Sequence, residues 1–335
     1  MTKNLNNNLD GISFIIPTWN KKEMVINCIW LLDKYLTIEY PKIPKEIIVV
    51  ENGSTDNTYK ALIKLKTKIP LIILKQNSNI GFAKAINLAT NKAKYNYLYL
   101  INNDMEVQPG FFKNIINTAN NLIKKKINFF GISSQIFFFN PTVKQVESGK
   151  TYINFKNGKL LVGHELNPQK LKNVSLTAYC GGGSSLINKK IFNLLGQYDY
   201  NVYTPLYCED LDLGFVAWKK GYPSFFCPDS HVIHHHRSSS NLLSINPDYY
   251  IKKNYLAFCL KNFDNPSLAL KLFFMYPIYL IFKKDYWQYL TDNLKNISNI
   301  IKSRNRLSKI SNVYKDTDLI NFTNFGIKNS YKYQI

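Results

Sequence analysis

The sequence predicts an α/β fold in which a mostly parallel sheet has a ligand site at one edge. Short apolar segments alternate with amphipathic ones over residues 12–101, and each apolar segment ends in polar or turn-forming residues. The clearest apolar segment, 97–101, continues directly into Asn102, Asn103 and Asp104. Strand–helix alternation of this kind is typical of parallel strands with crossover helices. In such sheets, ligands bind beyond the carboxyl ends of the strands.

The composition is that of a folded and strongly basic protein. The 335 residues are 45% hydrophobic and 14% aromatic, which is enough for a sizeable core. The formal net charge of +21 favours anionic partners such as nucleotides, nucleic acid or an anionic membrane, without choosing among them. Five scattered cysteines without a CxxC pair argue against structural zinc and a disulfide framework. The polar start of the sequence predicts no signal peptide, so we expect a cytoplasmic protein.

The first part of the chain is expected to alternate strictly between strands and helices. Strands are predicted at 12–16, 47–50, 71–74 and 97–101, and helices at 21–35, 55–66, 83–94 and from Pro109 onward. The second strand is β-branched and apolar throughout, as a strand buried on both faces should be. Ser54 or Thr55 is expected to cap the helix that follows it.

Beyond residue 126 the pattern is looser. The aromatic segment 129–139 has room for one or two strands, and 154–163 resembles a hairpin around Asn157-Gly158. Three glycines at 181–183 allow close backbone approach to a ligand or to another strand. Their spacing is not that of a dinucleotide-binding fingerprint.

An acidic cluster opens the helix predicted at 209–220. Glu209 and Asp212 share a helix face, while Asp210 projects about 100° away from Glu209. Acids at a helix start are favoured by the helix dipole, which is a purely structural explanation. Their mutual repulsion is nevertheless costly unless a cation or a reacting group uses the cluster.

Histidines and a lone carboxylate raise the question of a metal site. His234, His235 and His236 end a strand predicted at 228–236, and histidine is a common transition-metal ligand. Asp104 after its strand suits a hard cation. A hydrogen-bonding role for each histidine and a simple turn at 102–104 are the structural alternatives. The following segment, 237–240, has an arginine and serines that suit phosphate.

The C-terminal part is predicted to be helical from residue 249 and loosely ordered from about residue 313. The apolar run 268–282 is too short to span a bilayer. With the basic residues beyond it, this run suits either an anionic membrane surface or packing on the sheet domain. We therefore divide the chain into a disordered start (1–10), an α/β domain (11–245) and a C-terminal helical extension (246–335).

The order of the motifs resembles that of family 2 glycosyltransferases. The matching stretches are 14–20 with hhIPTYN, 48–56 with VVDNGSTD, 79–87 with NxGfaxaxN, 102–104 with the DXD-like metal motif, 209–213 with EDxDL, and 228–239 with PxxxvxHhxxxS. The resemblance covers about residues 11–260 and is greatest to a rhamnosyltransferase-like bacterial branch.

This resemblance implies a GT-A fold, in which a nucleotide-binding α/β half is fused to an acceptor-binding half. It also implies inverting transfer of a sugar from a nucleoside diphosphate to a hydroxyl of a glycan or lipid-linked acceptor in surface polysaccharide synthesis. The residues implied for the donor site are Pro17, Thr18, Asn20, Glu51, Asn52, Asn79, Gly81, Phe82, Asn102 and Asn103. Asp104 and His234 would bind Mn²⁺ or Mg²⁺, and Asp210 would be the general base. The residues implied for the acceptor side are Gly182, Gly183, Ser184, Glu209 and Asp212.

These residue types suit the implied chemistry. A cation held by a carboxylate and an imidazole neutralises a leaving diphosphate. An ionised carboxylate takes the proton of the acceptor hydroxyl, and the helix start is expected to keep Asp210 ionised.

Other classes of protein remain as alternatives. A catalytically silent nucleotide-sugar-binding or scaffolding protein is disfavoured because Asp104 and Asp210 are both present. A nucleic-acid binder is suggested by charge alone and is disfavoured by the acids at 209–212. A nucleotidyltransferase fits the acidic helix start poorly. Among donors, dTDP-rhamnose and a UDP-hexose both stay open.

Overall fold

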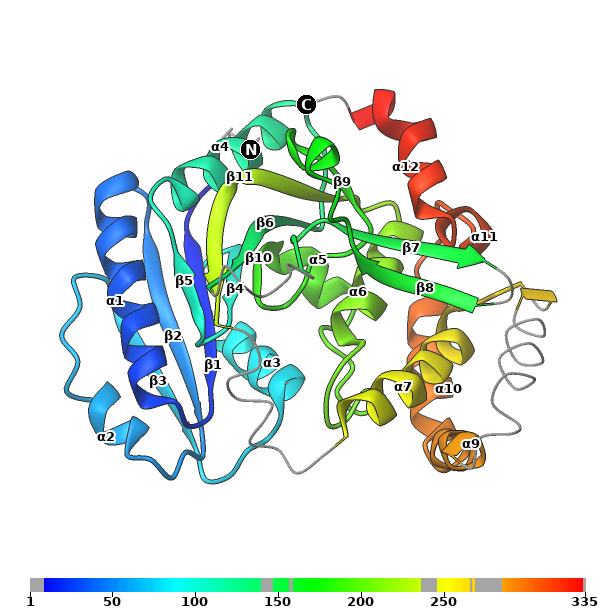
Figure 1. Cartoon of the computed structure of the whole chain (residues 1–335), viewed down its shortest axis with the longest axis horizontal. Helices are drawn as coiled ribbons and strands as arrows, with labels where there is room; N and C mark the ends of the chain where they lie inside the picture. The colour runs from blue at the N-terminus through cyan, green and yellow to red at the C-terminus, as the bar shows by residue number, and fades with distance from the viewer. Residues whose placement is uncertain are drawn as a thin grey trace, which may run out of the picture.

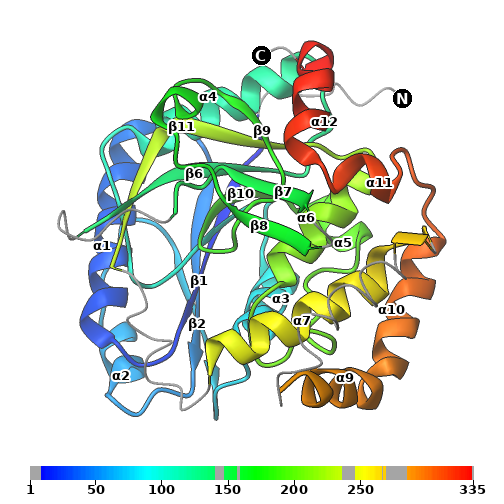
Figure 2. The same cartoon turned by 45° about the vertical axis from the view of Figure 1, so that its right-hand side comes forward.

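The computed structural model describes residues 9–139, 147–156, 159–235, 246–265, 267–268 and 285–333. Within these residues the central sheet has nine strands in the order β3-β2-β1-β4-β10-β6-β11-β5, with β9 paired to β11. Helices lie on both faces of the sheet, and the C-terminal helices gather beside it (Figures 1 and 2). The turn at 157–158, the segment 236–240 and most of the run 268–282 lie outside the described residues.

The first half of the sheet is parallel, as the sequence predicts. It consists of β1 (Ile12–Thr18), β2 (Lys45–Asn52), β3 (Leu71–Gln76) and β4 (Tyr97–Ile101). The connecting helices are α1 (Lys22–Glu39), α2 (Thr58–Leu62) and α3 (Phe82–Lys92). All four strands end at the same edge, so their polar end residues are brought together.

The capping prediction for α2 is wrong. This helix begins at Thr58 after Asn57, and no side chain caps it. The hydroxyl of Ser54 instead accepts a hydrogen bond from the Asn20 N–H at 2.9 Å. The N–H of Thr55 donates to Asn20 Oδ1 at 2.9 Å. The two residues therefore tie the loop after β2 to the loop after β1.

The second half of the sheet is mixed. Its strands are β5 (Met105–Val107), β6 (Gly131–Phe138), β9 (Ser175–Thr177), β10 (Ser184–Asn188) and β11 (Ser224–His234). The antiparallel strand β10 lies between β4 and β6 and joins the two halves into one sheet. Its neighbour β6 is parallel to β11. The predicted hairpin is present as a separate sheet of β7 (Thr151–Lys156) and β8 (Lys159–His164).

Alternate residues of the strands supply two cores, one on each face of the sheet. On one face, Phe14 and Ile16 of β1 pack with α1 and with α4 (Phe111–Lys124). On the other face, Ile15 packs with α3, α5 (Lys189–Leu194) and α6 (Glu209–Lys219). This explains why the central strands are apolar throughout, because a strand covered on both faces buries every side chain.

The C-terminal helices form a third core with α6. The helices of this core are α7 (Pro247–Asn262), α10 (Ile297–Ser308), α11 (Asp316–Leu319) and α12 (Phe322–Asn329), while α9 (Asp285–Lys295) packs on α7. The prediction of loose order from residue 313 is wrong. The rings of Phe322 and Phe325 pack on the buried Trp218 of α6, with centroid distances of 5.2 and 5.4 Å. None of the described helices is long and apolar enough to cross a bilayer.

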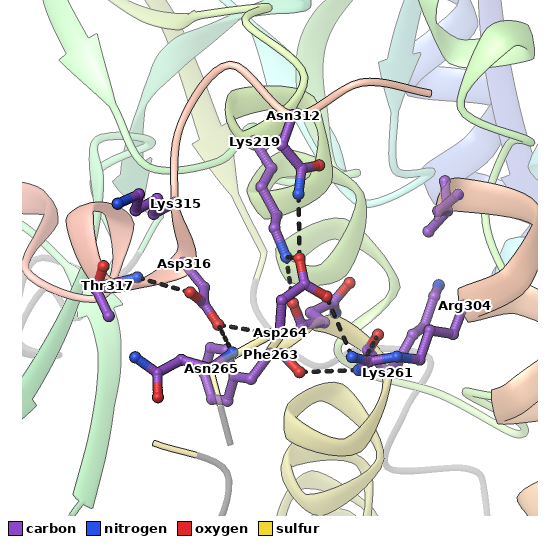
Figure 3. A network of polar contacts seen from close by, with 12 residues as sticks. Lys219, Lys261, Phe263, Asp264, Asn265, Arg304, Asn312, Lys315, Asp316 and Thr317 are labelled. Atoms are coloured by element: carbon purple, nitrogen blue, oxygen red, sulfur yellow. Dashed lines mark hydrogen bonds and ion pairs between the residues drawn. The ribbon is translucent and has the colours of Figure 1, made fainter. Parts of the chain in front are cut away.

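Polar contacts reinforce this third core (Figure 3). Lys219 at the end of α6 forms an ion pair with Asp264 at 2.7 Å. The guanidinium of Arg304 on α10 donates to the Phe263 carbonyl at 2.8 Å. Asp316 on α11 accepts from the Asp264 N–H at 2.7 Å. The segment after α7 is therefore held by α6, α10 and α11 together.

A buried lysine connects α7 to α6. The ammonium of Lys261 lies 2.6 Å from Asp212 Oδ2 and 3.0 Å from Asp199 Oδ2, and its side chain is 1% exposed. The other oxygen of Asp212 accepts from the Tyr203 hydroxyl at 2.8 Å and from Asn262 Nδ2 at 2.6 Å. All three charges are buried, so each depends on its partners for solvation.

Replacing Lys261 should therefore be costly. We expect Lys261→Met to lower the free energy of unfolding by about 3–5 kcal/mol, because two buried carboxylates lose their cation. Urea denaturation followed by tryptophan fluorescence measures this loss. The control is Lys295→Met, whose side chain is 79% exposed and should change stability little. Equal stability of the two variants would contradict the assignment of a buried ion pair.

Comparison of the wild type with Lys261→Met also tests how the stability of this ion pair depends on pH. Burial raises the pKa of Asp199, but the charge of Lys261 and the hydrogen bond from Ser303 outweigh it and lower the pKa below 3.8. A carboxylate with a depressed folded pKa adds stability that is present above its unfolded pKa and lost as pH falls through the folded pKa. Acidification below the unfolded pKa should thus cost the wild type more stability than Lys261→Met, and parallel losses would count against this account.

Candidate functional site

The ends of β1 and β4 are tied together by their polar residues. Thr18 is buried, and its hydroxyl accepts a hydrogen bond from Asn103 Nδ2 at 2.9 Å. Asn20 has a left-handed backbone with a φ of 57° and holds the loop after β2 through Thr55. Pro17 is the penultimate residue of β1. These implied donor-site residues therefore lie together at the carboxyl edge of the sheet.

A second group ties the end of β2 to the start of α3. Asn52 donates to Asn79 Oδ1 and accepts from the Ile80 N–H, both at 2.9 Å. Asn79 Oδ1 also accepts from the Gly81 N–H at 2.9 Å. Glu51 is buried, and its Oε1 accepts from the Ser54 N–H at 2.6 Å. Their nucleoside contacts stay predictions, while their contacts with one another fix the shape of the loops.

The glycine run 181–183 brings three motifs into contact. A Cβ at Gly182 would lie 2.8 Å from the Phe82 ring, and a Cβ at Gly183 would lie 2.8 Å from Asn102 Nδ2. A Cβ at Gly181 would lie 3.9 Å from Asp210 Oδ2. The carbonyl of Gly183 also accepts from the Asn102 N–H at 3.0 Å. The run therefore packs against the starts of α3 and α6 and the end of β4, and Ser184 begins β10 immediately after it.

Asp104 and His234 come together at the meeting of β4, β5 and β11. Nε2 of His234 lies 3.4 Å from Asp104 Oδ1, and both side chains are buried. The N–H of His235 donates to the Asp104 carbonyl at 3.0 Å, which fixes the relative position of the two segments. The ring of His235 pairs with Glu106 at 2.9 Å instead. His234 is thus the described histidine that faces Asp104, while His236 lies outside the described residues.

The donor atoms of this pair fit a divalent cation such as Mn²⁺ or Mg²⁺. A carboxylate oxygen suits either ion and an imidazole nitrogen suits Mn²⁺, and phosphate oxygens of a bound nucleotide commonly complete the shell. Within the described ranges, no group of three or more His, Cys, Asp or Glu side chains could hold a metal.

Glu147 is a site residue that the sequence analysis missed. Its Oε2 lies 2.9 Å from Nδ1 of His234, on the ring edge opposite Asp104. Burial lowers the pKa of His234, but the hydrogen bonds to Asp104 and Glu147 and their charges outweigh it and raise the pKa to about 9. The metal-free site therefore holds a protonated imidazole between two carboxylates at neutral pH. Glu147 belongs to no recognisable motif, so the sequence had no signal for it.

The acids at the start of α6 lie in a poorly solvated environment. Burial raises the pKa of Asp210, although hydrogen bonds from the backbone of Leu211 and Gly182 oppose it. Desolvation therefore outweighs the backbone donors at the helix start and leaves the pKa of Asp210 raised, while its ionisation at neutral pH stays a prediction. Burial and the charge of Asp210 raise the pKa of its neighbour Glu209 from 4.5 to about 8.

Asp212 does not take part in this site. Both of its oxygens are used by Lys261, Tyr203 and Asn262 inside the third core. The implied acceptor role for Asp212 is wrong, because its face of α6 is turned toward α7. Asp210, which projects from a different face, lies beside Gly181 instead.

Comparison with known proteins gives a family match. Residues 13–160 match the model of the family described as Glycosyl transferase family 2. The chain is 32% identical over 96 residues to a poly-beta-1,6-N-acetyl-D-glucosamine synthase of Staphylococcus aureus (strain COL). That match covers 29% of this chain and 22% of the length of the synthase. The family match confirms the resemblance that the order of the motifs indicates.

Solved structures share the fold over nearly the whole chain. GalNAc-T7, crystallised with UDP, GalNAc and Mn²⁺, has a TM-score of 0.67 and 18% identity, covering 97% of this chain and 57% of its own. Residues 1–349 of S. aureus TarS in complex with UDP-GlcNAc have a TM-score of 0.53 and 16% identity. The match covers 96% of this chain and 92% of the TarS chain. At these identities the likeness concerns the fold alone, and it confirms the GT-A fold with helices at the C-terminus.

Substitution of Glu209 should stabilise the protein at neutral to alkaline pH. The pKa of Glu209 is 4.5 in the unfolded chain and about 8 in the folded protein. Between these two pH values the Glu209 carboxyl must take up a proton when the wild type folds, so stability falls as pH rises through this range. Glu209→Gln does not titrate and should have a higher Tm than wild type near pH 8, with the difference shrinking toward pH 5. Thermal unfolding across this pH range measures the effect. A difference that does not change with pH would contradict the raised pKa.

Proposed function

We propose that this chain transfers a sugar from a nucleoside diphosphate to a hydroxyl of a glycan or lipid-linked acceptor, with inversion, because residues 13–160 match glycosyl transferase family 2. The observation that carries the proposal is the glycine run 181–183, which borders both the end of β4 and the carboxylate of Asp210. A donor bound at the sheet edge and an acceptor beside α6 would therefore meet there.

Asp210 has the properties of a general base for this reaction. Its carboxylate lies beside the backbone of Gly181 and Gly182, next to where the acceptor hydroxyl would be bound. A base works best when its pKa approaches the working pH, and burial shifts the pKa of Asp210 in that direction. Attack by the deprotonated hydroxyl displaces the diphosphate in one step. No protein nucleophile is needed, so the anomeric configuration is inverted.

Asp104 and His234 would hold Mn²⁺ or Mg²⁺ at the end of β4. The bound cation would neutralise the charge that develops on the leaving diphosphate. The loops fixed by Thr18, Asn52 and Asn79 would position the nucleoside on the other side of the diphosphate.

Uridine nucleotides are bound in several solved structures of this fold, while the mannosyltransferase PcManGT was solved with GDP-Man and Mn²⁺. GalNAc-T7 was solved with UDP and Mn²⁺, and TarS with UDP-GlcNAc. The name of the related synthase also specifies an N-acetylglucosamine polymer. We therefore propose a UDP-sugar such as UDP-GlcNAc, used in polysaccharide synthesis.

Glu209 is proposed to contribute to the acceptor side. It is buried beside Asp210, and a pKa of about 8 keeps its carboxyl mostly protonated at neutral pH. A protonated carboxyl is able to donate a hydrogen bond to an acceptor oxygen, whereas the charged base next to it accepts one.

Release of nucleoside diphosphate from a panel of nucleotide sugars tests this function. We expect release from one UDP-sugar, dependent on Mn²⁺, and a loss of about 10²–10⁴-fold in Asp210→Asn because the general base is removed. Asp318→Asn on the exposed surface of α11 is the control and should be fully active. Release that survives in Asp210→Asn would refute the assignment of the base. Nucleotide binding without turnover of any donor would favour a catalytically silent binding protein.

Peripheral contact with an anionic membrane is a further part of the proposal. Trp287 and Leu294 of α9 are 57% and 55% exposed, and Lys295 beside them is also exposed. Apolar and basic side chains exposed together suit the surface of an anionic bilayer.

Liposome flotation tests membrane contact. We expect flotation with vesicles that contain phosphatidylglycerol and none with pure phosphatidylcholine, and a clear reduction in Trp287→Ser. Trp30→Ser on α1 is the matched control, because Trp30 is 64% exposed but far from α9 in the sequence. Absence from the anionic vesicles, or an equal effect of both substitutions, would refute docking through α9.

A further inference from the structure

We infer that Glu147 is a positioning residue that fixes the ring of His234 so that Nε2 is presented to the divalent cation. The inference rests on the proposed metal role of Asp104 and His234. It assigns a function to a carboxylate that lies outside every motif of the sequence and that has no place in the proposed reaction.

The contacts of the His234 ring carry this inference. Oε2 of Glu147 lies 2.9 Å from Nδ1, and Oδ1 of Asp104 lies 3.4 Å from Nε2. The two carboxylates therefore approach the two nitrogens of one imidazole. A neutral imidazole has one N–H and one lone pair, and the hydrogen bond at one nitrogen decides which of them the other nitrogen presents. With Glu147 accepting from Nδ1–H, a cation that displaces the proton of Nε2 would bind the Nε2 lone pair on the side of Asp104.

The backbone around His234 leaves the ring little other freedom. His234 is the last residue of β11 and is paired with Phe138 of β6 on one side and with Met105 of β5 on the other. The Phe138 ring lies against the imidazole, with a centroid distance of 6.4 Å. The strand thus sets the position of the ring, and the bond to Glu147 sets its orientation and tautomer.

Glu147 contacts the histidine that faces Asp104, whereas a second carboxylate nearby, Glu106, contacts the neighbouring histidine. Oε1 of Glu106 lies 2.9 Å from Nε2 of His235, so it is an equally close carboxylate beside the adjacent histidine. The His235 ring stacks on Phe139, with a centroid distance of 4.3 Å, and pairs with Glu106 rather than with Asp104. Carboxylates that orient metal-bound histidines commonly contribute about 10–100-fold to metal affinity. That contribution is expected from Glu147 and not from Glu106.

The test measures Mn²⁺ binding directly, without sugar transfer. Free Mn²⁺ is titrated by electron paramagnetic resonance in the presence of saturating UDP, with wild type, Glu147→Ala and Glu147→Gln. We expect about 10–100-fold weaker Mn²⁺ binding in Glu147→Ala. Glu147→Gln should bind with intermediate affinity, because its amide oxygen still accepts from Nδ1–H. Glu106→Ala is the matched control and should bind as the wild type does.

The outcomes separate this inference from the proposed function. Wild-type affinity in Glu147→Ala would overturn the positioning role alone. Equal losses in the Ala and Gln variants would also overturn it, because they would show that only the charge of Glu147 matters. A wild type that does not bind Mn²⁺ would overturn the inference together with the metal part of the proposed function. The Tm of each metal-free variant is measured as well, and a large drop shared by both Glu147 variants would indicate a structural role instead.

Discussion

The close passage of the glycine run 181–183 is the constraint on which the rest of the site depends. Any side chain at Gly182 or Gly183 would overlap the Phe82 ring or the Asn102 amide, at 2.8 Å in both cases. The absence of Cβ atoms at these two positions lets Phe82 at the start of α3 and Asn102 after β4 lie against the run, and Asp210 of α6 lies beside Gly181. The strand β10 begins directly after the run, and it is the antiparallel strand that joins the parallel half of the sheet to the mixed half.

The helix α6 connects this site to the C-terminal helices. Its first turn presents Asp210 to Gly181, while Asp212 is held by Lys261 of α7 and Lys219 by Asp264. The aromatic rings of α12 pack on Trp218 of the same helix. The position of the proposed base therefore depends on buried charges and rings on the opposite side of α6. This gives the C-terminal extension a supporting role for the site, whatever else it contacts.

The parallel half of the fold and its ligand edge could be predicted because they depend on local patterns. Apolar segments that end in polar residues identify parallel strands, and Asp104 follows such a segment, whereas Asp210 lies in the acidic first turn of helix α6. Glu147 could not be found in this way, because its contact with His234 spans 87 residues and follows no periodicity. Helical spacing correctly separated the faces of Asp210 and Asp212 but could not show that Lys261 covers one of them. The burial of Phe322 and Phe325 is likewise a long-range effect, invisible in a polar stretch of sequence.

The central claim is that Asp104 and His234 form the metal end of one active site, with Asp210 at its acceptor end. A crystal structure with UDP and Mn²⁺, with anomalous data collected for manganese, tests it most directly. We expect a manganese peak bound by Asp104 and by Nε2 of His234, with the UDP diphosphate on the cation and Asp210 facing the sugar side of it. A manganese peak on other residues, or UDP bound away from the carboxyl edge of β1 and β4, would contradict the account.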